Sequence, residues 1–146
     1  ILDPIQTKIK IIFPIHPRTR KNIESYNINH KLQNMKNVIV TEPLGYLDFL
    51  RLMSGSKFIL TDSGGIQEET TVLGIPCITL RENTERPVTV EQGTNLLVST
   101  NKGNVVKKAI ESIENKIKIR PKRPELWDGK AAERIVKILL GHNARH

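Results

Sequence analysis

The chain has 146 residues, a formal net charge of +8 and a single cysteine, Cys77. One cysteine excludes an internal disulfide and favours a reducing compartment, which argues against the disulfide-rich secreted classes. No apolar run approaches the roughly 20 residues of a membrane-spanning helix, and the first ten residues lack the order of a signal peptide. We therefore expect a cytoplasmic protein with no membrane partner.

The positive charge is concentrated near the C-terminus, because residues 100–146 carry +7 of the total. The most basic stretch, KIKIRPKRP at 116–124, contains two prolines and no aromatic residue on which bases could stack. We interpret it as a solvated linker and expect no nucleic-acid partner.

Short apolar runs rich in β-branched residues alternate with segments of helical periodicity. The apolar runs predict buried strands at 10–15, 37–40, 57–61, 76–80 and 95–98. The periodic segments predict helices at 18–32, 46–56, 66–74, 102–115 and 129–140. The last helix has an apolar side that we expect to face the core, made of Ala132, Ile135, Val136, Leu139 and Leu140. This alternation predicts an α/β fold, a Rossmann-like parallel sheet with helices on both faces.

Polar residues follow the predicted strands at the point where each strand ends. They are His16 and Arg18, Glu42, the segment 62–65, and the segment 81–86. Because the carboxyl ends of parallel strands meet at one edge of a sheet, where ligands bind, we expect a ligand site there.

The segment TDSGGIQEET at 61–70 is compatible with several kinds of site, two of them protease active sites and one a phosphate-binding turn. Trypsin-like proteases carry Asp-Ser-Gly-Gly on β-barrels, and aspartic proteases carry Asp-Ser-Gly in β-rich folds, whereas the residues after Gly65 are helical in pattern. A Ser-Gly-Gly turn before a helix N-terminus also suits a diphosphate, because it offers unpaired N–H donors and partial positive charge. An ordinary glycine-rich turn with Ser63 as the N-cap explains the sequence equally well.

The other candidate side chains each have a structural explanation as well. Glu68 and Glu69 suit ribose hydroxyls but also the dipole of a first helical turn. Arg86 is either a phosphate ligand or a surface arginine, and His16 is either a ligand contact or a satisfied loop histidine. The four histidines match no metal spacing, so we expect neither a metal nor a cofactor. Cys77 is expected to be a small buried residue.

Several separated motifs in order resemble the C-terminal half of the non-hydrolysing UDP-N-acetylglucosamine 2-epimerases. They are IIFPIHPRTR, TEPLGYLDFLRLM, TDSGGIQEET, GIPCITLRENTERPVTVEQGTN and PELWDGKAAERIVKIL, and together they cover nearly the whole chain. The resemblance implies that residues 1–146 are the C-terminal UDP-binding domain of a two-domain GT-B fold, with the N-terminal domain absent.

The resemblance also implies roles for particular residues. Residues that bind the substrate's UDP would be Ser63, Gly64 and Gly65 at the diphosphate, Glu69 at the ribose, Arg86 near the phosphates and Phe49 on the uracil. His16, near the phosphates, is the candidate catalytic residue. Packing of an amphipathic helix, together with Leu47, Leu50 and Met53, is the alternative explanation for Phe49.

The implied activity is interconversion of UDP-N-acetylglucosamine and its manno epimer by elimination and re-addition of UDP. The resemblance suggests a homodimer for the full-length protein, and we expect residues 1–146 alone to be inactive because the family's acid/base carboxylates lie mainly in the other domain. Three alternatives remain open: a UDP-sugar glycosyltransferase, a hydrolysing epimerase and a non-catalytic nucleotide sensor.

Overall fold

The computed structural model describes residues 1–117 and 124–143. The strands are β1 (Ile11–Pro14), β2 (Val38–Thr41), β3 (Ile59–Thr61), β4 (Cys77–Thr79) and β5 (Asn95–Leu97). The helices are α1 (Leu2–Gln6), α2 (Pro17–Ser25), α3 (Asn29–Gln33), α4 (Tyr46–Ser54), α5 (Gly64–Leu73), α6 (Pro87–Glu91), α7 (Lys102–Ile113) and α8 (Ala131–Asn143). None of these helices has the length and apolar character needed to cross a bilayer.

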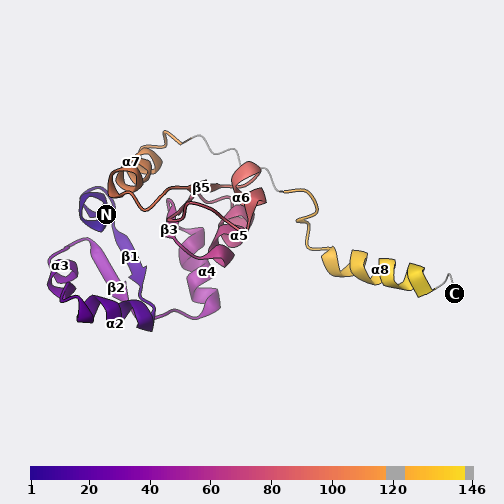
Figure 1. Ribbon diagram of the computed structural model, residues 1–146, viewed down its shortest axis with the longest axis horizontal. Coiled ribbons are helices and arrows are strands. Elements are labelled where there is room, and N and C mark those ends of the chain that lie inside the picture. Colours follow the sequence, from indigo (N-terminus) through magenta and orange to yellow (C-terminus); the bar gives the residue numbers. More distant parts are fainter. Residues whose placement is uncertain (118–123, 144–146) are drawn as a thin grey trace.

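All the described strand pairings are parallel, and the predicted α/β Rossmann-like class is confirmed (Figure 1). The strands nevertheless form two sheets rather than the single expected one. β1 pairs with β2, while β4 lies between β3 and β5 in the other sheet. Every residue of β4 is buried, which explains why its sequence is uniformly apolar or small.

The helix expected at 18–32 is two helices, α2 and α3. Asn27 separates them with a φ of 51°, in the left-handed region that asparagine tolerates better than most residues. The sequence also gave no sign of α1 and α6, which have five residues each. Segments this short contain too little periodicity to be recognised.

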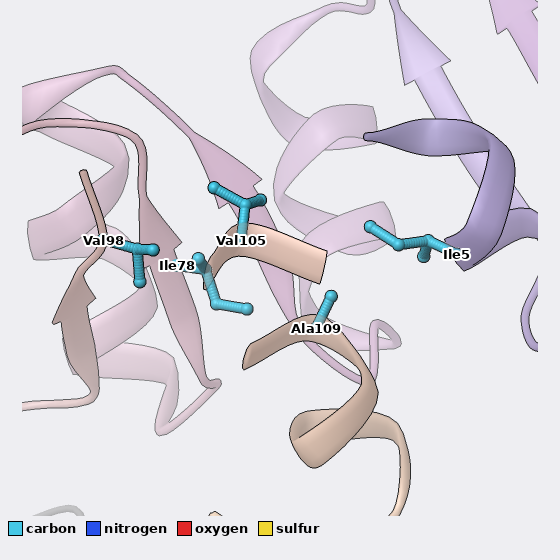
Figure 2. Close-up of a cluster of buried hydrophobic side chains, with 5 residues drawn as sticks. All are labelled: Ile5, Ile78, Val98, Val105 and Ala109. Atoms are coloured by element: carbon cyan, nitrogen blue, oxygen red, sulfur yellow. The ribbon is translucent and has the colours of Figure 1, made fainter. Parts of the chain in front are cut away.

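The main hydrophobic core joins α1 and α7 to the sheet formed by β3, β4 and β5. Its buried members, shown in Figure 2, are Ile5, Ile78, Val98, Val105 and Ala109. Cys77, also in β4, is fully buried, as expected. Burial raises the pKa of its thiol, so the side chain is a neutral packing group.

Helix α8 lies apart from the other elements (Figure 1). Its apolar side was expected to face the core, and this expectation is wrong for the described chain: Ile135 is 57% exposed and Leu139 is 60% exposed. Ala132, Val136 and Leu140 are exposed too. An amphipathic pattern identifies the apolar side of a helix but does not supply the surface that covers it. The linker predicted at 116–124 falls largely outside the described residues.

Candidate functional site

The turn between β3 and α5 carries the strongest candidate site. α5 begins at Gly64, and Ser63 is its N-cap with extended backbone but no capping hydrogen bond from its side chain. The N–H of Ser63 donates to Oγ1 of Thr61 at 3.1 Å. The N–H groups of Gly64, Gly65 and Ile66, by contrast, make no hydrogen bond to any described residue. Free donors at a helix N-terminus, with the positive end of the helix dipole, are suited to an anion.

Neither glycine in this turn is required by backbone geometry, because both belong to the first turn of α5 and neither has a positive φ. A Cβ added to Gly65 would meet no atom within 4 Å, and one added to Gly64 would come within 3.6 Å only of Oε2 of Glu85. A tight turn therefore does not require glycine at either position. The absence of a side chain at Gly65 leaves open space beside the free N–H groups.

Arg86 lies beside the same helix, although it comes from the loop between β4 and α6. Its Nε donates to Oε1 of Glu68 at 2.9 Å. A longer contact, 3.4 Å, joins Nη1 to the carbonyl of Glu85. The ion pair occupies one edge of the guanidinium and places a positive side chain next to the start of α5.

Of the two glutamates in α5, only Glu68 has a described partner. Glu69 is half-buried and makes no hydrogen bond or ion pair with any residue that the structure describes. Its carboxylate is therefore free to accept hydrogen bonds from a ligand, as the sequence-based interpretation requires.

His16 follows β1 and is the N-cap of α2. Its Nδ1 accepts a hydrogen bond from the N–H of Arg18 at 3.2 Å, so Nε2 is the nitrogen left for a ligand. Nearby, Arg20 of α2 forms an ion pair at 2.6 Å with Glu42, the residue after β2. No hydrogen bond or ion pair between described residues links this group to the start of α5, so the convergence of His16 with Ser63 stays a prediction.

Phe49 lies on α4 and is half-buried, while Met53 of the same helix is fully buried. Its proposed contact with a base stays a prediction. A hollow of about 290 Å³ lies elsewhere, lined by residues of α2, α3 and β2 with Arg20 at its side. It contains none of the candidate residues, so the candidate site is an open surface around the α5 N-terminus.

The sequence analysis missed a set of buried polar side chains behind this surface. Gln67, Thr79, Thr89 and Asn95 are all buried and joined by hydrogen bonds. Polar side chains are mostly exposed in folded proteins, so a sequence gives no reason to expect several of them buried together. The amide pair of Gln67 and Asn95, 28 residues apart in the chain, could not be recognised without the fold.

Comparison with known proteins gives a consistent result. The sequence profile of the family described as UDP-N-acetylglucosamine 2-epimerase matches residues 1–140. A relative of that name from Methanocaldococcus jannaschii is 53% identical over 129 residues, which are 88% of this chain and 34% of the relative. One from Campylobacter jejuni is 39% identical over 137 residues, covering 90% of this chain and 34% of the relative.

Solved structures agree with the sequence comparison. The M. jannaschii enzyme crystallised with UDP-GlcNAc and UDP superposes with a TM-score of 0.77 and 51% identity, over 90% of this chain and 35% of that chain. The Neisseria meningitidis enzyme bound to UDP-GlcNAc superposes with a TM-score of 0.73 and 37% identity, over 90% and 36%. The chain thus spans about a third of the length of these relatives, and it belongs to the UDP-N-acetylglucosamine 2-epimerase family.

Proposed function

We propose that this chain is the C-terminal, UDP-binding domain of a UDP-N-acetylglucosamine 2-epimerase with GT-B architecture. The observation that carries the proposal is the set of free N–H groups on Gly64, Gly65 and Ile66, with open space in front of Gly65. Family membership supports the identity of the anion, because the M. jannaschii relative was crystallised with UDP-GlcNAc and UDP.

The proposed arrangement assigns the diphosphate to the start of α5. Ser63 and the two glycines contact it through main-chain N–H groups, and Arg86 adds a positive charge from the neighbouring loop. Glu69, which has no described partner, accepts the ribose hydroxyls, and Phe49 packs on the uracil. His16 contributes the Nε2 that its N-cap bond leaves unoccupied.

The chemistry explains why holding UDP matters for epimerisation. The hydrogen on C2 of the sugar is not next to a carbonyl, so direct deprotonation is difficult. Loss of that proton together with cleavage of the C1–O bond gives UDP and a 2-acetamidoglucal. Protonation of C2 from the opposite face and attack of the UDP oxygen on C1 give the epimer. Preorganised donors stabilise the negative charge that UDP develops in both directions.

The other half of the active site is proposed to lie in a separate N-terminal domain, so residues 1–146 should bind UDP weakly and not epimerise. We also propose that the full-length protein is a cytoplasmic homodimer. A single buried thiol and a nucleotide-sugar substrate support the compartment.

Calorimetric titration of UDP into residues 1–146 tests the binding part of the proposal. The expected result is saturable binding that uridine alone does not reproduce, since uridine lacks the diphosphate. Absence of UDP binding would refute it. For the full-length protein, release of the manno epimer still linked to UDP is expected. Release of free UDP and free N-acetylmannosamine would instead indicate a hydrolysing epimerase, and transfer of sugar to an added acceptor would indicate a glycosyltransferase.

A further inference from the structure

The fully buried side chain of Gln67 lies at the centre of a hydrogen-bond network behind the candidate site. Its Oε1 accepts two hydrogen bonds, from Oγ1 of Thr84 at 2.6 Å and from Nδ2 of Asn95 at 2.9 Å. Its Nε2 donates to the carbonyl of Ser63 at 3.3 Å. One amide therefore links the turn before α5 to the loop before α6.

The same network holds both main-chain groups of Arg86. The N–H of Arg86 donates to Oγ1 of Thr84 at 3.0 Å, and Thr84 in turn donates to Gln67. The carbonyl of Arg86 accepts from Oγ1 of Thr89 at 2.7 Å, and Thr89 accepts from Nδ2 of Asn95. The Gln67–Asn95 pair thus reaches Arg86 through two separate hydroxyl groups.

The buried pair of amides, Gln67 and Asn95, is suited to fixing the relative positions of the residues bonded to it. Buried amides that lose a partner are costly, so each member constrains the orientation of the others. Arg86 itself has an exposed side chain, and its ion pair with Glu68 is exposed as well. Its backbone, by contrast, is bonded to Thr84 and Thr89, and Gln67 joins their network to the carbonyl of Ser63.

We propose that Gln67 and Thr84 are positioning residues for the UDP site, setting Arg86 relative to the Ser63–Gly65 turn so that both contact the same diphosphate. This inference rests on the proposed function. It explains why polar side chains occupy the interior between α5, β4 and β5, where apolar ones would pack without needing partners.

The test is a double-mutant cycle on UDP binding, measured by calorimetry. Thr84→Val keeps the shape of the side chain and removes the hydroxyl that joins Gln67 to the Arg86 N–H. We expect UDP affinity to fall about five- to tenfold, and Thr84→Ser to restore it to within about twofold. Arg86→Gln should cost much less affinity in the Thr84→Val background than in the wild type, because a misplaced Arg86 already contributes little.

Thr79→Val is the matched control. Thr79 donates to Oδ1 of Asn95 at 2.6 Å and has no hydrogen bond to Arg86 or Ser63. Its removal leaves in place the two Nδ2 bonds of Asn95, to Gln67 and Thr89, through which the network reaches Arg86. It should lower the melting temperature while leaving UDP affinity within about twofold of the wild type. The Nε signal of Arg86 in NMR spectra should shift in Thr84→Val and not in Thr79→Val.

The outcomes separate this inference from the proposed function. Wild-type binding with equal Arg86→Gln losses in both backgrounds would overturn the positioning role and leave UDP binding intact. Equal losses of affinity in Thr84→Val and Thr79→Val would likewise overturn it, because the network would then act only through stability. Absence of wild-type UDP binding would overturn both.

Discussion

The Nε of Arg86 lies 2.9 Å from Oε1 of Glu68. This ion pair joins the loop before α6 to α5, the helix that contains Glu68. The two side chains are 44% and 40% exposed, and an ion pair in that setting contributes roughly 0–1 kcal/mol to folding. The ion pair therefore matters for the orientation of the Arg86 side chain more than for stability. The pair holds Nε of the guanidinium, while Nη2 makes no hydrogen bond to any residue that the structure describes.

Replacing Arg86 by glutamine should lower UDP affinity about tenfold or more, because a charge-assisted hydrogen bond to phosphate is lost. Arg81→Gln is the control, since Arg81 occupies the same loop and pairs with Glu85 at 3.5 Å. Calorimetry should show near wild-type affinity for that variant. Similar losses for both arginines would indicate a general effect of positive charge and not a specific contact.

Gly65→Val should abolish UDP binding while leaving the fold intact, because the added side chain enters space that is empty in the protein alone. Gly93→Ala should do the reverse. A Cβ there would lie 2.5 Å from both Oγ1 of Thr71 and the carbonyl of Thr89, so we expect about 1–3 kcal/mol of destabilisation. Melting curves and UDP titrations of the two variants distinguish these effects. A destabilised Gly65→Val protein would contradict the open space described here.

Leu139→Gln on α8 should change the free energy of unfolding of residues 1–146 by less than about 0.5 kcal/mol, because Leu139 is 60% exposed. Ile78→Ala, in the buried cluster of β4, should cost about 2–5 kcal/mol. Urea denaturation measures both. A large loss for Leu139→Gln would mean that α8 packs on the rest of this chain in solution.

Asp128 should make the start of α8 sensitive to acid. Its carboxylate accepts hydrogen bonds from Arg134 and from the N–H of Lys130, and these lower its pKa from 3.8 to about 2. Because the folded pKa is depressed, the stabilising contribution is present above pH 3.8 and is lost as the pH falls towards 2. NMR chemical shifts of residues 131–134 should move towards coil values over that window. In Asp128→Asn the shifts should not follow this titration.

The strands could be predicted from sequence because their signal is local. β-branched runs such as NVIV and PCITL are bounded by turn residues, and a buried parallel strand needs little else. The break between α2 and α3 depends on one residue, Asn27, whose left-handed backbone follows from no periodicity. The division into two sheets and the exposure of α8 depend on which surfaces meet, and no local pattern encodes that.

The candidate site was predictable in part for a similar reason. A strand followed by Ser-Gly-Gly and a helix identifies free N–H groups from chain order alone. The need for two glycines could not be judged from the sequence, because their backbone angles are ordinary and the open space at Gly65 follows from the fold. Gln67 could not be found, since its partners Thr84 and Asn95 reach it through folding.

The division into two sheets bears on how the isolated chain will behave. Among the described residues, β1 pairs only with β2, and β3 pairs only with β4. The N–H groups of Ile11 and Ile15 donate to β2 and the residue before it. Because successive N–H groups of a strand point to opposite sides, the N–H of Ile12 points to the unpaired edge of this sheet. A parallel strand between β1 and β3 would join all the strands in the doubly wound order.

Unpaired edges of β-sheets can pair with further strands, including strands of another copy of the same chain. If residues 1–146 form aggregates that grow with concentration, unsatisfied main chain at β1 and β3 is the first explanation to examine. Such self-association would reflect strand pairing and would not test the proposed homodimer.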